Sequence, residues 1–167
     1  MERRKKLNSS MQLTRAADYG VRVMMALASM PEGERVSLPE LTKVTGAPES
    51  FLSKVLQALG KAALIESRRG QGGGFEIGQR GRGASILEIV QAIDGPIRLN
   101  VCLCEEKVCQ RKVWCPASPV WARAQKAMFE VLEATRIQDL AEQGAANQFT
   151  TIVAPIIAPA MHSQVAN

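Results

Sequence analysis

The feature that most constrains the fold of this chain is the order of its patterns, in which three predicted helices are followed by a glycine-rich hairpin. Apolar side chains recur at helical spacing over residues 14–30, and Thr14 can cap the start of that helix. Ser37 and Glu40 have the spacing of a capping box and predict a short second helix that ends in a glycine turn. A third helix is predicted to start at Pro48, because proline suits the first helical position. Three short helices in this order predict a helix-turn-helix unit.

Two short strands are predicted next, over residues 64–68 and 75–77. The segment 69–74 between them contains four glycines, which allow positive φ angles and favour a flexible hairpin tip. We call this hairpin the wing. The predicted fold class is therefore mainly α with a small β-hairpin wing, a winged helix-turn-helix.

Three further helices are predicted after the wing, the last a short one that Thr135 caps and that runs through Glu142. Ser85 caps one that runs to about Ile93, and Asp94-Gly95-Pro96 stops it. The longest helix is predicted over residues 119–135, with an apolar stripe that a small winged domain does not need for its own core. We interpret it as a dimerisation helix that pairs with its twin, and packing onto its own domain is the alternative.

These patterns divide the chain into five segments. We expect a disordered lead, a winged helix-turn-helix domain, a cysteine loop, a dimerisation helix region and a flexible tail, over residues 1–11, 12–97, 98–117, 118–143 and 144–167.

Composition and charge distribution indicate where a polyanion would bind. Aromatic residues make up only 4% of the chain, so the core must be aliphatic, which favours helices. Residues 1–84 carry 14 Lys and Arg against 8 Asp and Glu, whereas residues 85–167 carry 7 against 8. The anion-binding half is therefore predicted to be the N-terminal one.

The sequence lacks a recognisable export signal or membrane segment. The charged residues 1–6 are not followed by an apolar stretch, and no apolar run approaches the roughly 20 residues of a membrane span. We therefore expect a cytoplasmic protein without a membrane partner. In such a reducing compartment structural disulfides are disfavoured, which favours metal binding or redox sensing by cysteines.

The third helix and the base of the wing supply side chains that suit DNA. Polar side chains of the right size for base edges fall on the exposed helical face, and two arginines follow the first strand. A solvated basic face on an ordinary helical domain is the alternative interpretation. The predicted DNA-binding residues are Ser50, Ser53, Lys54, Gln57, Arg68 and Arg69.

All four cysteines of the chain lie within fourteen residues, at Cys102, Cys104, Cys109 and Cys115. Charged neighbours such as Glu105 exclude this segment from a core. The spacing lacks the C-x2-C knuckles of structural zinc sites, and wider spacing in a loop suits an iron–sulfur cluster. We predict metal or cluster binding, with redox disulfide chemistry as the alternative.

Two other ionisable residues, His162 and Asp18, have simpler roles than catalysis. His162 is the only histidine and lies in the predicted tail, so triads that need a histidine have little support and the chain is not predicted to be an enzyme. Asp18 lies on the first helix without an obvious local partner, and its simplest role is that of a first-turn helix charge.

Four segments together resemble the Rrf2 family of bacterial transcription regulators, and in particular its IscR-like and NsrR-like members. The likeness covers about residues 11–143. Its most specific parts are the glycine-rich wing and the cysteine loop. The matching segments are Leu13-Thr14-x3-Asp18-Tyr19, residues 69–75, residues 86–90 with Asp94-Gly95-Pro96, and the cysteine segment before Trp121.

The resemblance implies a homodimer whose long helices cross between subunits. It also implies a 2Fe–2S or 4Fe–4S cluster held by three loop cysteines of each subunit. By position, Cys109 and Cys115 match the second and third of these, and the first is either Cys102 or Cys104. Family members also contact DNA at the positions of Ser50, Lys54 and Arg69.

The fourth ligand differs between branches of the family. IscR-like members carry a histidine three residues after the last cysteine, where this chain has Ser118. NsrR-like members can use an aspartate from the partner's first helix, and Asp18 matches that position. The fourth ligand is therefore Asp18 or the extra cysteine, and four loop cysteines can also hold a cluster within one subunit.

The expected function follows from both lines of reasoning. We expect a transcriptional regulator, a repressor of a double-stranded DNA operator, that senses nitric oxide, redox state or iron status through an iron–sulfur cluster. The alternative is a winged-helix regulator without iron that zinc stabilises or a thiol–disulfide switch controls.

Overall fold

The fold is mainly helical, and a computed structural model describes residues 13–70, 72–104 and 109–145. The predicted lead and nearly all of the predicted tail lie outside the described residues. The elements in chain order are α1 (Arg15–Ala28), α2 (Leu38–Thr45), α3 (Glu49–Lys61), β1 (Ile65–Arg68), β2 (Gly74–Ile77), α4 (Ile86–Asp94), the 3₁₀ turn η1 (Val101–Leu103), α5 (Ser118–Ala134) and α6 (Ile137–Ala145).

The predicted helix starts are confirmed by their caps. The Thr14 hydroxyl accepts a hydrogen bond of 3.1 Å from the backbone N–H of Ala17 at the start of α1. The Glu40 carboxylate accepts one of 2.7 Å from the N–H of Ser37, which completes the capping box of α2. The third helix begins one residue later than predicted, since Pro48 is its N-cap.

The wing is a two-stranded antiparallel sheet. Ile65 pairs with Ile77 and Arg68 with Gly74, so the strands enclose the glycine-rich tip. The connection between α1 and α2 forms an isolated antiparallel β-bridge with β2, because Val36 and Phe75 exchange two backbone hydrogen bonds of 2.9 Å. The wing is thus attached to the helix-turn-helix through its second strand.

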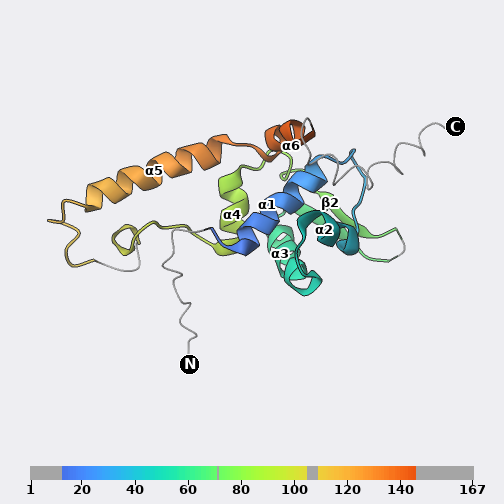
Figure 1. The fold of residues 1–167 in the computed structure, drawn as a ribbon, viewed down its shortest axis with the longest axis horizontal. Coiled ribbons are helices and arrows are strands. Elements are labelled where there is room, and N and C mark those ends of the chain that lie inside the picture. Colours follow the sequence, from blue (N-terminus) through green and yellow to red (C-terminus); the bar gives the residue numbers. More distant parts are fainter. Residues whose placement is uncertain (1–12, 71, 105–108, 146–167) are drawn as a thin grey trace, which may run out of the picture.

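A single aliphatic core lies around α1, which Figure 1 shows at the centre of the helices. Helix α1 packs against α2, α3, α4 and α6. The low aromatic content predicted an aliphatic core, and the largest fully buried side chains are Met24, Leu27, Leu41, Leu52, Leu59, Ile89 and Ile137. We call this packed unit, α1 to α4 with the wing and α6, the body.

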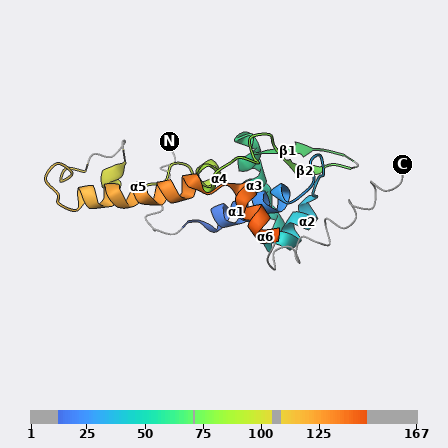
Figure 2. The same ribbon diagram turned by 90° about the horizontal axis from the view of Figure 1, so that it is seen from above.

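Helix α5 extends away from the body as an arm, and the views in Figures 1 and 2 agree on this. Among its described residues only Ser118 is buried, while Val120 and Val131 are 55% and 65% exposed. The arm is joined to the body at its C-terminal end. There the N–H of Ile86 donates to Thr135, and the N–H of Ile137 donates to Ala84.

Within the described part of the chain, no helix is both long and apolar enough to cross a membrane.

Candidate nucleic-acid interface and cysteine loop

Helix α3 has one buried face and one exposed polar face. Leu52, Val55, Leu56 and Leu59 are buried in the core, which fixes the rotation of the helix. Ser50, Lys54 and Gln57 are exposed on the opposite side, as predicted. Ser53 differs from the prediction, because it is half-buried and its hydroxyl donates to the carbonyl of Glu49 at 3.0 Å. Three of the four predicted side chains are therefore open to a ligand on this helix.

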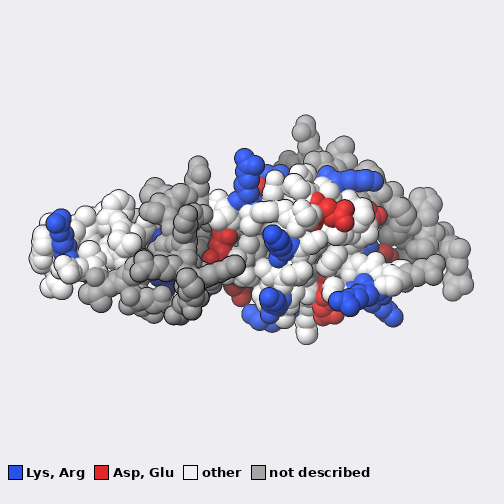
Figure 3. All heavy atoms as spheres, turned by 90° about the horizontal axis from the view of Figure 1, so that it is seen from below, with Lys and Arg blue, Asp and Glu red and all other residues white. Residues whose placement is uncertain are grey.

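The two wing arginines are exposed next to the glycine tip. Arg68 ends β1, and Arg69 follows it. The side chains of Arg68, Arg69 and Lys54 make no hydrogen bond or ion pair with any residue that the structure describes. Figure 3 shows several Lys and Arg side chains over the body, with acidic side chains between them. Cations without an internal partner are available to a phosphate backbone.

An aromatic pair lies at the edge of α3 that faces α1. The rings of Tyr19 and Phe51 meet edge to face with centroids 5.7 Å apart, and the Arg22 guanidinium lies 5.9 Å from the Tyr19 ring. Its helical spacing predicts that Phe51 faces inward beside Leu52 and Val55, yet Phe51 is 37% exposed. The helical spacing could not show this, because Phe51 falls at the border between the two faces of the helix.

The four cysteines are all free thiols, and they differ in burial. Cys102 lies in η1 and is only 7% exposed, whereas Cys104, Cys109 and Cys115 are half-buried. The sulfur of Cys104 lies 3.9 Å from the carbonyl oxygen of Asn100. Residues 105–108 between the second and third cysteines lie outside the described residues.

The described parts of the cysteine loop, residues 98–104 and 109–117, lie on the arm side of the body, where η1 contacts α5 and residues 109–117 lead into the far end of the arm (Figure 1). The side-chain oxygen of Gln125 in α5 accepts a hydrogen bond of 3.0 Å from the N–H of Leu99. Trp114 is 67% exposed, and the Arg111 guanidinium lies 6.0 Å from its ring. The loop is thus anchored to the arm, while part of its surface remains apolar and open.

Asp18 is on the exposed side of α1. Its carboxylate pairs with Arg22 at 2.9 Å, an i,i+4 ion pair between side chains about half exposed. The local partner that sequence inspection missed is thus one helical turn away. In the described part of one chain, no three His, Cys, Asp or Glu side chains gather closely enough to hold a metal ion. Asp18 and the cysteines do not form a completed site there.

The start of α1 is bonded to the end of α4. The Thr14 hydroxyl donates a hydrogen bond of 2.6 Å to the Asp94 carboxylate, while it caps α1. Asp94 is the last residue of α4, directly before the segment that leads to the cysteine loop. The cap of α1 is therefore in direct contact with the start of that segment.

Comparison with known proteins identifies the family. The family model of Rrf2, described as an iron-dependent transcriptional regulator, matches residues 13–143. The chain belongs to the Rrf2 family of transcriptional regulators. Rrf2 winged-helix regulators bind DNA, so the chain is a DNA-binding transcription regulator and not an enzyme.

Solved structures of Rrf2-like regulators share this fold. CymR of B. subtilis, the global cysteine regulator, is 26% identical with a TM-score of 0.64, and the match covers 80% of this chain and 98% of CymR. The oxidized form of Staphylococcus aureus CymR is 25% identical with a TM-score of 0.63, over 79% and 97% of the two chains. IscR of T. potens is 23% identical with a TM-score of 0.64, over 81% and 89%, and this likeness concerns the fold alone.

Proposed function

We propose that this Rrf2-family regulator is a homodimeric repressor that senses nitric oxide, redox state or iron status through an iron–sulfur cluster in the cysteine loop. The observation that carries the proposal is the placement of four free thiols in one loop, outside the core and beside the arm. A loop of this kind is separate from the DNA-binding surface, and a signal must be transmitted between the two.

The proposed DNA contact places α3 in the major groove and the wing on the flanking backbone. Ser50, Lys54 and Gln57 are exposed for contacts with base edges, and Ser53 contributes only after its hydroxyl leaves the Glu49 carbonyl. Arg68 and Arg69 lie where phosphate or the minor groove would meet the wing, and neither has a competing carboxylate in the described residues.

Substitution of the cations tests this docking. Lys54→Ala or Arg69→Ala should each weaken binding to an operator duplex and lower the salt slope of binding by about one if the residue contacts a phosphate. Lys126→Ala is the matched control, because Lys126 is an exposed cation on the arm. Operator affinity that stays unchanged in both test variants would contradict the docking.

The proposed dimer uses the exposed stripe of α5. Val120, Trp121 and Val131 leave 55%, 36% and 65% of their surface open. A second copy of the helix would cover this stripe and place two recognition helices at a fixed separation, which suits a two-fold operator.

The cysteine loop provides donors that fit an iron–sulfur cluster. Thiolate sulfur is the usual ligand of such clusters, and Cys104, Cys109 and Cys115 are free and half-buried. We propose these three as ligands, since Cys102 is buried against its surroundings. The fourth position falls to Cys102 or to Asp18 of a second subunit. When bound, such a cluster supplies iron that reacts with nitric oxide or oxygen, or that is lost when iron is scarce.

Two hydrogen bonds connect the loop and the segment before it to the rest of the molecule, one to the arm and one to the body. One is the bond between Leu99 and Gln125, which ties the loop to the arm. The other is the bond between Asp94 and Thr14, which ties the segment before the loop to α1, and α1 packs directly on α3. We propose that movement of the loop shifts α1 and the arm and so changes the separation of the two recognition helices.

Anaerobic purification with visible spectroscopy and iron and sulfide analysis tests the cluster. Cys109→Ala or Cys115→Ala should give a colourless protein, because each removes a proposed thiolate ligand. Cys102→Ala and Asp18→Ala then decide the fourth position, since only the variant that lacks a ligand loses iron or shifts the spectrum. A Cys109→Ala protein that keeps its brown colour and its iron would refute the role of Cys109.

A second candidate is a thiol switch without iron, and the similarity to CymR favours it. The CymR structures include one that is described as oxidized, and all four cysteines here are free thiols. This alternative predicts a colourless protein as isolated anaerobically. It also predicts that mild oxidation changes DNA binding and that dithiothreitol reverses the change.

A further inference from the structure

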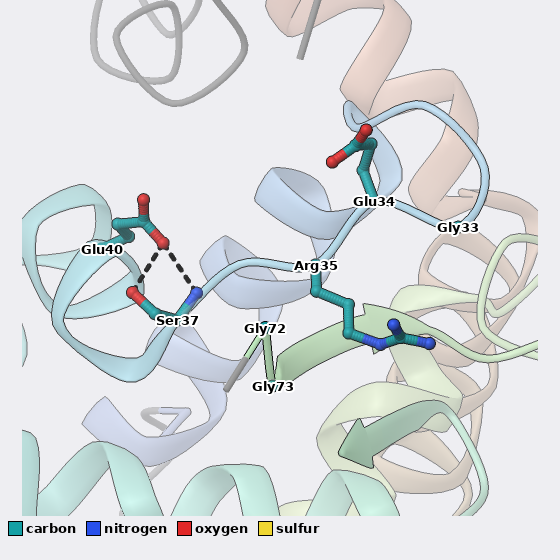
Figure 4. A pocket seen from close by; sticks show the side chains of 7 residues that line it. All are labelled: Gly33, Glu34, Arg35, Ser37, Glu40, Gly72 and Gly73. Atoms are coloured by element: carbon teal, nitrogen blue, oxygen red, sulfur yellow. Dashed lines mark hydrogen bonds between the residues drawn. The ribbon is translucent and has the colours of Figure 1, made fainter. Parts of the chain in front are cut away.

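One ion pair joins the helix-turn-helix to the wing. Arg35 lies in the connection between α1 and α2, and its Nη2 is 2.7 Å from Oε1 of Glu76 in β2. Their side chains are 27% and 19% exposed, whereas every other described ion pair joins side chains that are at least 46% exposed. Figure 4 shows the Arg35 side chain extending from the connection along the wing. A partly buried pair is screened less by salt than an exposed one.

The register of the wing explains why Glu76 needs a cation. Glu76 lies directly opposite Glu66 in the two-stranded sheet. Like charges in such cross-strand positions repel each other and destabilise the pairing. Arg35 places its guanidinium on Glu76 and compensates for this repulsion. Without Arg35, the hairpin would keep two facing carboxylates, one of them largely buried.

The backbone beside the ion pair is also closely joined. Val36 and Phe75, each next to a member of the pair, exchange two hydrogen bonds of 2.9 Å. A Cβ atom at Gly74 would lie 2.8 Å from the carbonyl oxygen of Val36, so only glycine permits this approach. The connection and β2 therefore meet over consecutive residues, and Arg35 adds the charged contact at one end of this junction.

This junction is at the base of the part of the wing that carries the arginines. Gly74, two residues before Glu76, is the register partner of Arg68. Any rotation of the wing about its base would move Arg68 and Arg69 relative to α3. We infer that Arg35 is a positioning residue, which holds the wing through Glu76 at the orientation in which Arg68 and Arg69 reach DNA. The inference rests on the DNA docking proposed above.

A charge reversal and its repair test the inference. The probe is a duplex selected from a random-sequence pool by the unaltered protein. Arg35→Glu should weaken binding at least about tenfold and lower the salt slope by up to about two, one for each wing arginine. The double variant Arg35→Glu with Glu76→Arg restores an opposite pair and should recover most of both quantities. Arg35→Leu removes the charge with a side chain closer in size to arginine than glutamate is. It replaces Arg35→Glu as the test variant if the charge reversal prevents folding.

Two controls separate a positioning role from a general effect of charge or stability. Lys126→Glu makes the same change in net charge on the exposed arm, and it should leave the salt slope within error. Arg68→Ala with Arg69→Ala measures how much the wing contributes. A loss of stability alone would lower the melting temperature without a selective fall in the salt slope of the folded protein.

The outcomes are distinguishable. If the arginine double variant lowers the slope and Arg35→Glu does not, this inference fails and the proposed docking stands. Failure of the charge swap to restore binding in a folded protein would also overturn it. If the arginine double variant leaves the slope unchanged, the proposed wing contact fails, and the role of Arg35 fails with it.

Discussion

The body and the arm differ in how their apolar side chains are covered. In the body, α1 is surrounded by α2, α3, α4 and α6, and side chains such as Leu59 and Ile89 are fully buried. In the arm, α5 has seventeen residues, and among those described only the side chain of Ser118 is buried. The body therefore satisfies its own hydrophobic surface, and the arm does not.

This difference separates two kinds of stability within one chain. The body should fold and unfold as a unit whose stability depends on its core. A helix of seventeen residues is close to the length at which isolated helices are marginal in water. The arm is thus expected to depend on what covers it, and under our proposal this is a second copy of α5.

The largest expected effect is in the core of the body. Ile89→Ala should lower the free energy of unfolding by about 2–5 kcal/mol, because it removes a fully buried side chain and leaves a cavity. Urea denaturation at one fixed protein concentration measures it. Ala122→Gly in the arm, an exposed position, is the comparison and should cost about 1 kcal/mol from helix propensity alone. Equal losses of unfolding free energy in both variants would contradict the view that the core of the body, and not the arm, determines stability.

The next effect concerns association through the arm. Ala124→Glu places a carboxylate in the exposed stripe of α5, and burial of an unpaired charge opposes association. We expect the dissociation constant of the proposed dimer to rise at least about tenfold, which analytical ultracentrifugation measures. The helical content of the body, followed by circular dichroism, should change little. Lys126→Glu places the same carboxylate on the opposite side of α5, with a net-charge change of two units instead of one. A similar loss of dimer in that variant would argue against the stripe.

The smallest effects come from two turns in the body that use the same backbone conformation. Gly46 ends α2 at a φ of 68°, and Ala63 follows α3 at a φ of 56°. Because side chains disfavour this left-handed region, Gly46→Ala should cost about 1 kcal/mol and Ala63→Gly should stabilise by up to about 1 kcal/mol. Thermal denaturation should show a lower melting temperature for Gly46→Ala and a higher one for Ala63→Gly. Stabilisation by both, or destabilisation by both, would show that local packing outweighs backbone strain.

Much of the body could be predicted from the sequence because its signals are local. Thr14 and Ser37 have the side chains that cap a helix, and glycines mark the tip of the wing. These features depend on residues within a few positions of each other. The helical spacing of apolar and polar residues also placed Ser50, Lys54 and Gln57 correctly on the exposed side of α3.

Other features could not be predicted because they depend on contacts between distant residues. The pair of Arg35 and Glu76 and the bond of Thr14 to Asp94 join residues 41 and 80 positions apart. The burial of Cys102, in contrast to Cys104, has no local signal in the sequence, and its element η1 contacts the distant helix α5. The cysteine site stays a prediction, since its spacing indicates thiolate chemistry and not which thiols act together.

The attachment of the arm has a consequence for how such regulators can diversify. The chain leaves the body after Asp94 at one end of α4 and returns at Thr135, bonded to Ile86 at the other end. The two ends of this long excursion are therefore only the length of a nine-residue helix apart, about 13 Å. An insertion anchored in this way can change in length or chemistry without disturbing the core that it leaves and re-enters. The body is in this sense a DNA-binding module whose core is separate from the arm and the cysteine loop, where we propose that sensing takes place.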